Sequence, residues 1–179
     1  MDTFEAITTR KSVRSYEPTP VPKEKLERIL EAARLAPSAI RIQPWHFIVV
    51  TDAEKRKELS RGMFAKFLNE APVVIVACGD TKASPDWCVV DVSIATENLV
   101  LAATNEGLGT CWVGSFNEEQ VKMLLKIPEQ FTVIALIAVG YGREKFSLTR
   151  SISAAVRGRK KLEDIASAEE YGKSYLPQS

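Results

Sequence analysis

Residues 10–14 read Arg-Lys-Ser-Val-Arg, and residues 37–45 read Pro-Ser-Ala-Ile-Arg-Ile-Gln-Pro-Trp. The first stretch is a dense cationic segment with one hydroxyl among its charges. Three positive charges and several hydrogen-bond donors suit a compact dianion such as a phosphate group. A charge cluster of this size is more often a solvated surface loop, so the segment alone leaves both interpretations open. The second stretch joins a helix-stopping proline to small and polar residues and then to an aromatic anchor.

A second basic cluster lies near the other end of the chain, where residues 157–161 read Arg-Gly-Arg-Lys-Lys. Two cationic clusters that flank one core repel each other unless an anion lies between them. A phosphate group carries close to two negative charges and would allow the clusters to meet. The alternative interpretation is again a solvated helix start.

A glycine-rich stretch, residues 107–114, reads Gly-Leu-Gly-Thr-Cys-Trp-Val-Gly. Its spacing does not match the dinucleotide-binding fingerprint, and it runs from a helix into a strand instead of from a strand into a helix. A helix cap explains Gly107 but explains neither Gly109 nor Gly114. Because Gly114 has no side chain, a planar ring could approach its backbone amide closely.

The chain has 179 residues and a formal net charge of +1. This length predicts a single domain over residues 1–179, and the charge argues against nucleic-acid and membrane partners. Three scattered cysteines and one histidine, His46, argue against a disulfide framework, a metal site or a histidine-based hydrolase. With no signal-like apolar segment near the start and no run long enough to span a bilayer, we expect a cytoplasmic protein.

Apolar periodicity and turn signals predict helices and strands that alternate irregularly, which indicates an α+β arrangement. We expect helices in residues 2–9, 22–36, 91–106, 117–126 and 162–166, helical turns broken near Gly62 in residues 53–70, and strands in residues 46–51, 73–78, 110–113 and 131–141. The helix over residues 91–106 is apolar almost all round, which predicts burial on two sides, in part against another subunit. The acidic residues Asp86, Asp91, Glu97, Glu118 and Glu119 show no general acid–base spacing, and we interpret them as helix caps and solvated faces.

In order and spacing, four segments resemble the nitroreductase family of FMN-dependent oxidoreductases. These segments are residues 10–14, 37–47, 91–116 and the basic tail around residues 157–159. The resemblance implies an α+β fold, a three-layer α/β/α sandwich with a mostly antiparallel central sheet. It also implies an intertwined homodimer assembled through the long central helix, with two FMN sites at the dimer boundary.

The resemblance assigns cofactor contacts to particular positions. The basic segment would contact the FMN phosphate, ribityl chain and ring edge, and the basic tail would close over the phosphate. Residues 37–39 would reach the flavin from the neighbouring subunit, and residues 112–114 would run along the ring with the Gly114 amide near flavin N5. The expected cofactor-binding residues are Arg10, Lys11, Ser12, Arg14, Pro37, Ser38, Ala39, Arg41, Gln43, Trp112, Val113, Gly114, Arg157 and Arg159.

One position departs from the family pattern, which often has Asn where this chain has Arg41. An arginine only donates hydrogen bonds and carries a charge, whereas Asn both donates and accepts. If Arg41 points at the flavin, it should favour an anionic reduced ring. If it points away, Gln43 would substitute for the lost contact.

The resemblance implies an enzyme that uses NADH or NADPH to reduce nitroaromatics, quinones or flavins by a ping-pong hydride mechanism. No catalytic side chain is expected, because the flavin carries the chemistry. Since no separate dinucleotide domain is evident, NAD(P)H and the small-molecule acceptor would use the same flavin face in turn. Two alternatives stay open, a non-enzymatic flavin-binding protein and a specialised member such as a flavin reductase, a dehalogenase or a flavin-degrading enzyme.

Overall fold

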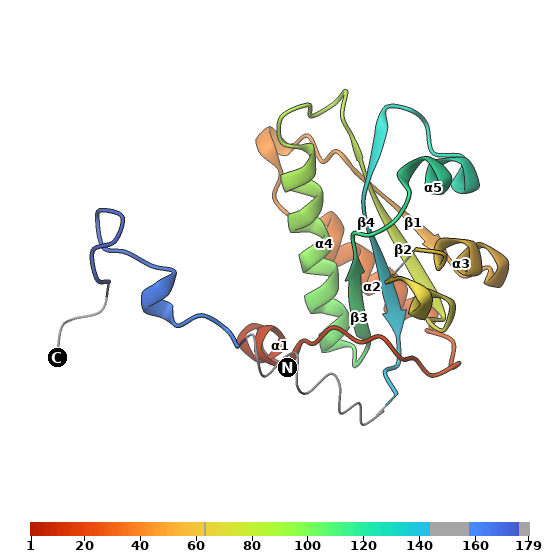
Figure 1. The fold of residues 1–179 in the computed structure, drawn as a ribbon, viewed down its shortest axis with the longest axis horizontal. Helices are drawn as coiled ribbons and strands as arrows, with labels where there is room; N and C mark the ends of the chain where they lie inside the picture. The colour runs from red at the N-terminus through yellow and green to blue at the C-terminus, as the bar shows by residue number, and fades with distance from the viewer. Residues whose placement is uncertain (63, 144–157, 176–179) are drawn as a thin grey trace. The chain divides into compact units, whose positions relative to one another are not determined.

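A computed structural model of the chain describes residues 1–62, 64–143 and 158–175. The chain divides into two compact units, Met1–Arg143 and Glu144–Ser179. The first unit contains the sheet and the helices that cover it (Figure 1). The described part of the second unit contains a short 3-10 helix, Leu162–Asp164, and a bridge between Ser167 and Ser174. A single domain over residues 1–179 therefore stays a prediction.

Among the described residues, four strands form one antiparallel sheet in the order β1-β2-β4-β3. The strands are β1 (Trp45–Val50), β2 (Val73–Asp80), β3 (Gly109–Val113) and β4 (Phe131–Gly140). The two central strands are nearly continuous apolar runs because both of their faces are covered, and residues 73–79 of β2 are all buried. This sheet confirms the expected mostly antiparallel arrangement.

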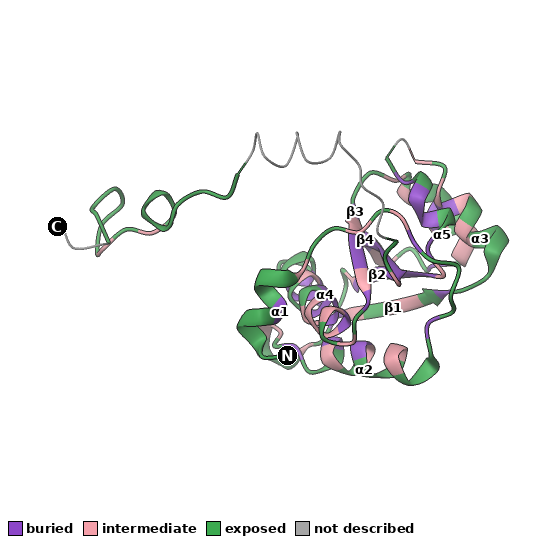
Figure 2. Cartoon of the chain, turned by 90° about the horizontal axis from the view of Figure 1, so that it is seen from below, coloured by how far each residue is buried: buried purple, intermediate pink, exposed green. Residues whose placement is uncertain are grey.

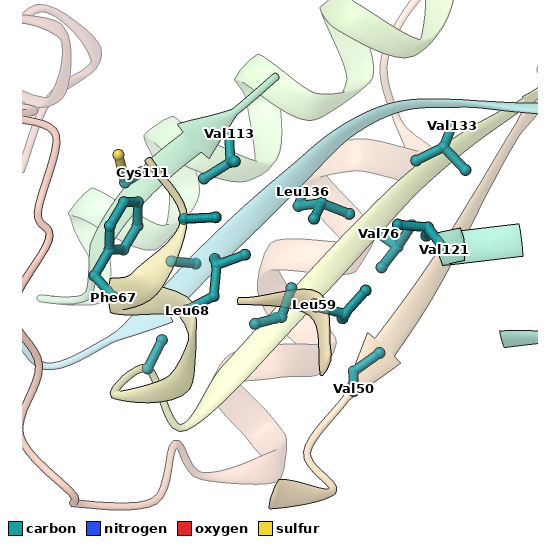
Figure 3. Packing of buried hydrophobic residues seen from close by; sticks show 14 of the residues in the cluster. Val50, Leu59, Phe67, Leu68, Val76, Cys111, Val113, Val121, Val133 and Leu136 are labelled. Carbon is teal, nitrogen blue, oxygen red and sulfur yellow. The ribbon is translucent and has the colours of Figure 1, made fainter. Parts of the chain in front are cut away.

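Helices cover both faces of the sheet and complete three layers (Figure 2). One layer consists of α2 (Lys23–Arg34) and α4 (Cys88–Asn105), and the other of α3 (Ala53–Leu59), the 3-10 helix Lys66–Asn69 and α5 (Glu118–Leu125). Successive strand residues face opposite layers, so Ile75 packs toward α2 and α4 while Val76 packs toward the other layer. Figure 3 shows Leu59 and Leu68 in this second core. The three-layer sandwich expected from the sequence is confirmed.

The central helix α4 is apolar on two faces, as expected, but only one face is covered by the residues that the structure describes. Val92, Ala95 and Leu99 are fully buried, whereas Trp87 is 57% exposed and Ile94 is 38% exposed. The helix begins at Cys88, one turn before the expected start at residue 91. Its N-cap residue, Trp87, makes no side-chain capping bond, so the sequence carries no start signal at this point.

The segment after α3 turns sharply at Gly62, which confirms the predicted break. A Cβ atom built on Gly62 would lie 2.6 Å from the backbone carbonyl oxygen of Ser115. The turn therefore packs backbone to backbone against the segment that follows β3, and a larger residue at position 62 would force the two apart.

The outer edge of β3 is occupied by the basic segment near the N-terminus. Ser12 forms a parallel bridge with Thr110, and the Val13 amide donates to the Thr110 carbonyl oxygen at 2.8 Å. The hydroxyl of the fully buried Tyr16 donates to the Val13 carbonyl oxygen at 2.6 Å. Val13 also packs on Gly109, where a built Cβ atom would lie 2.6 Å from a Val13 methyl carbon. Gly109, which a helix cap does not explain, is thus required for this contact.

We predict that Gly109→Ala lowers the free energy of unfolding by about 1–3 kcal/mol, because the new methyl group overlaps Val13. Chemical denaturation of the cofactor-free protein measures this change. Gly114→Ala is the matched control on the same strand edge, since nothing lies within 4 Å of a Cβ atom there. Equal stability of the two variants would contradict the packing described for Val13.

Candidate functional site

The basic segment is a short extended stretch presented on the surface by β3. It follows α1 (Thr3–Thr9), whose last turn ends at Arg10. Because neighbouring residues of an extended chain point to opposite sides, inward-facing Val13 leaves Ser12 and Arg14 facing outward. Both of these residues are exposed, as is Lys11. The segment therefore offers cationic and hydroxyl groups to solvent from a backbone that is firmly held.

Glu97 of α4 lies near both the basic segment and β3. Its carboxylate attracts Arg10 and accepts a hydrogen bond from the Trp112 side chain, whose only donor is the indole N–H. Although Glu97 is exposed overall, partial burial of its carboxyl raises the pKa of that group above its usual value, against the opposing effects of the Arg10 charge and the Trp112 hydrogen bond. Glu97 thus lies near both Arg10 and Trp112, two residues predicted to bind the cofactor.

The end of β3 offers an open backbone surface. Trp112 is partly exposed and Val113 is buried, so the strand is anchored up to its last residue. Gly114 follows directly, is exposed, and has no heavy atom of the described residues within 4 Å of the position where a Cβ atom would stand. A flat molecule could therefore reach the Gly114 backbone without meeting a side chain at this position, and the role of Gly114 in binding stays a prediction.

Residues 37–43 form a tight and strained loop after α2. The backbone φ angles of Ile40, Arg41 and Gln43 are 40°, 62° and 54°, in the left-handed region that non-glycine residues rarely adopt. Within the loop, the Gln43 amide donates to the Ser38 hydroxyl oxygen at 3.0 Å. The Arg41 side chain is exposed. Ser38, Ala39 and Gln43 therefore belong to one compact structural element.

This loop is attached to the first turn of α4 by Asp91. The Asp91 carboxylate accepts a hydrogen bond from the Ala39 amide at 3.1 Å, and Asp91 is only 3% exposed. Our interpretation of the acidic residues as caps and solvated faces is therefore wrong for Asp91. It is also wrong for Glu118, whose carboxylate accepts hydrogen bonds from the Val133 amide and the Thr132 hydroxyl, each at 2.9 Å.

Asp91 carried a sequence signal that we missed. It lies four residues before the buried Ala95, on the face of the helix that periodicity predicts to be covered. An acidic residue on such a face needs a hydrogen-bond partner, and this requirement points to an attached loop. Glu97 gave no comparable signal, because it lies outside the covered face of the helix and is exposed.

Predicted site residues lie near two points along α4. The loop 37–43 is attached at Asp91, and Arg10 and Trp112 lie near Glu97. Asp91 and Glu97 are six residues apart, which corresponds to roughly 9 Å along the helix axis and roughly 120° around it. Figure 1 shows the loop before β1 beside the start of α4 and α1 toward its other end. Between the two groups lies an exposed apolar stripe formed by Trp87, Val90 and Ile94.

Two predicted residues belong to the second unit. Arg157 lies outside the described residues, and Arg159 is exposed. Within the described ranges, no cluster of three or more His, Cys, Asp or Glu residues could hold a metal ion. A search of the same ranges for a helix long and apolar enough to cross a membrane found none.

Comparison with known proteins places these features in a family. The family model described as "Nitroreductase family" matches residues 7–68 and 60–141. A protein of Archaeoglobus fulgidus, provisionally named an NADH dehydrogenase/NAD(P)H nitroreductase, is 42% identical over 147 residues, which cover 78% of this chain and 84% of that protein.

Solved structures agree with this assignment. A Parabacteroides distasonis protein with the same provisional name matches with a TM-score of 0.83 and 34% identity, over 94% of this chain and 98% of that one. An FMN-dependent nitroreductase from Clostridium difficile matches with a TM-score of 0.74 and 32% identity, over 88% and 99% of the two chains. The sequence and the fold together show that this chain belongs to the nitroreductase family.

Proposed function

We propose that this protein is a homodimeric, FMN-dependent oxidoreductase that uses NADH or NADPH to reduce small oxidised acceptors such as nitroaromatics, quinones or flavins. Membership of the nitroreductase family supports an oxidoreductase. The cofactor assignment rests mainly on the edge of β3. There the basic segment pairs with Thr110, and the open backbone of Gly114 follows the last residue of the strand. A cytoplasmic location remains a prediction.

The chemical groups on this edge suit the phosphate, ribityl chain and ring of FMN. Arg10, Ser12 and Arg14 supply charged and hydroxyl donors suited to a phosphate and a ribityl chain. Gly114 leaves room for an isoalloxazine ring and offers its amide as a donor to flavin N5. In the second unit, Arg159 carries a further exposed charge, which the family resemblance assigns to the phosphate.

The dimer is proposed because one chain leaves an apolar surface between its two groups of site residues. Trp87 and Ile94 lie on the exposed face of α4, which would be costly to leave in water. A second copy seated on this stripe would be flanked by the basic segment on one side and the loop 37–43 on the other. Pro37, Ser38 and Ala39 could then reach the flavin held by the partner's basic segment.

When bound, FMN would supply the two-electron chemistry, accepting a hydride from NAD(P)H and passing it to an acceptor in a ping-pong cycle. The protein's own residues would bind the cofactor and orient it. Glu97 accepts a hydrogen bond from the Trp112 indole and attracts Arg10, and would help to orient both side chains toward the cofactor. Arg41 carries a positive charge on the strained loop and would favour an anionic reduced ring if it points at the flavin.

The main alternative is a flavin-binding protein without enzymatic activity, which needs the same edge of β3 but no space for a nicotinamide. Anaerobic addition of NADH or NADPH to the FMN-loaded protein separates the two. We expect loss of flavin absorbance near the visible maximum, followed by its recovery when a quinone or a nitroaromatic is added. Bound flavin that stays oxidised with both nicotinamides would favour the non-enzymatic alternative. The specialised activities expected from the sequence are distinguished by which acceptor restores the absorbance.

We predict that Arg10→Ala and Arg159→Ala each weaken FMN binding by roughly 1.5–3 kcal/mol, the contribution of a charge-assisted hydrogen bond. Riboflavin lacks the phosphate, so its affinity should not change. Gly114→Ala should weaken FMN and riboflavin equally, because the added methyl group meets the ring. Fluorescence titration of both flavins against the three variants tests the assignment. Equal losses for the two flavins in Arg10→Ala would show that Arg10 does not bind the phosphate.

We also predict that Ile94→Lys separates the dimer and releases FMN, because it places a charge on the exposed stripe of α4. Met123→Lys is the matched control, since Met123 is an aliphatic residue on α5 that is 79% exposed. Sedimentation velocity together with the flavin content of each variant gives the result. An Ile94→Lys monomer that keeps full FMN occupancy would rule out the shared site.

A further inference from the structure

Asp91 has a buried carboxylate of which only one oxygen accepts a hydrogen bond from the described residues. Oδ1 accepts the hydrogen bond from the Ala39 amide, while Oδ2 is buried and has no hydrogen-bond partner in the described part of the chain. A buried oxygen without a partner is unfavourable for stability. The packing of α2 on α4 does not need this carboxylate, because Ile29 and Ala33 already pack in the same cluster as Leu99. Stability alone therefore does not explain an acid at this position.

The loop attached to Asp91 has a strained backbone, which requires stabilising contacts. Ile40 has a φ angle of 40°, which is strongly disfavoured for a β-branched residue. Such strain persists only where the surroundings determine the backbone conformation more than once. Three hydrogen bonds lie inside the loop. The Arg41 amide donates to the Ser38 carbonyl oxygen, the Ile42 amide to the Ala39 carbonyl oxygen, and the Gln43 amide to the Ser38 hydroxyl oxygen. The bond from Ala39 to Asp91 is different in kind, since it fixes the loop to α4.

The attachment point also has a definite position relative to the exposed stripe. Asp91 precedes Ile94 by three residues and follows Val90 directly, so the loop stands beside the surface proposed to contact a second copy. Any shift of the loop on α4 would change where residues 37–39 arrive on the partner. The hydrogen bond from the Ala39 amide to Asp91 would therefore determine where the loop of one subunit lies at the flavin site of the other.

We propose that Asp91 is a positioning residue for the flavin site of the neighbouring subunit, acting through the loop 37–43. This inference rests on the proposed function. It adds that the hydrogen bond from the Ala39 amide to Asp91 keeps the strained loop in the shape that reaches the flavin ring. Since the loop reaches the ring and not the phosphate, its effect on riboflavin and on FMN is the same.

Three variants separate the hydrogen bond from the charge. Asp91→Asn keeps an oxygen for Ala39 and should retain FMN affinity within about threefold. Asp91→Ala removes the acceptor and should weaken FMN and riboflavin alike by about tenfold or more, the effect of one lost hydrogen bond to a charged group. Ala39→Pro removes the donor and leaves Asp91 unchanged. It should match Asp91→Ala, because proline is accepted at the first position of a helical turn. Asp86→Ala, an exposed acid just before α4, is the control and should bind like the wild type.

A mixed dimer tests whether the effect crosses the interface. Two differently tagged chains, one carrying Asp91→Ala and the other Arg10→Ala, are co-expressed and the mixed dimer is isolated. If the loop acts on the partner's site, one site contains both changes and the other contains neither. At an FMN concentration that fills the wild type but neither variant homodimer, we expect one FMN per mixed dimer.

The outcomes are distinct. No FMN in the mixed dimer would mean that Asp91 acts within its own subunit, and the proposal would be wrong. A folded Asp91→Ala dimer with wild-type affinity, or an Asp91→Asn variant as weak as Asp91→Ala, would also overturn it. If Asp91→Ala does not fold, Ala39→Pro takes its place in the titration and in the mixed dimer. A wild-type protein that takes up no FMN would refute the proposed function itself, which is a separate result.

Discussion

The pairing of Ser12 and Val13 with Thr110 is the interaction on which the candidate site depends. It closes the edge of β3 and turns an N-terminal charge cluster into an ordered surface. The contact is possible because Gly109 has no side chain and because the Tyr16 hydroxyl donates a hydrogen bond to the Val13 carbonyl oxygen. Without this pairing, the basic residues would be a solvated loop, which is what a charge cluster of this size usually is.

The long helix α4 relates this edge to the rest of the molecule. Its buried face completes the core with α2, and its exposed face separates the basic segment from the strained loop. Asp91 attaches the strained loop to the helix, and Glu97 lies near Arg10 of the basic segment. One helix therefore serves as a core element, as a proposed dimer surface and as a frame for the proposed cofactor contacts.

Much of the fold could be predicted from the sequence, because apolar runs and turn residues determine it locally. The runs in β2 and β4, the break at Gly62 and the cap at Asn117 all appear where the pattern placed them. The candidate site was only partly accessible. The role of Gly109 depends on Val13, almost a hundred residues away, and the positive φ angles of the loop 37–43 occur at Ile, Arg and Gln, which do not signal a left-handed backbone. The face of α4 left uncovered also depends on tertiary packing, since both faces are apolar.

The central claim is that each flavin site is built from two chains. The most direct measurement is a dilution series of the FMN-loaded wild-type protein, followed by sedimentation and by the fluorescence of released flavin. If each site is built from two chains, free flavin and monomer appear at the same protein concentration. A monomer that keeps its FMN at concentrations far below dimer dissociation would contradict it.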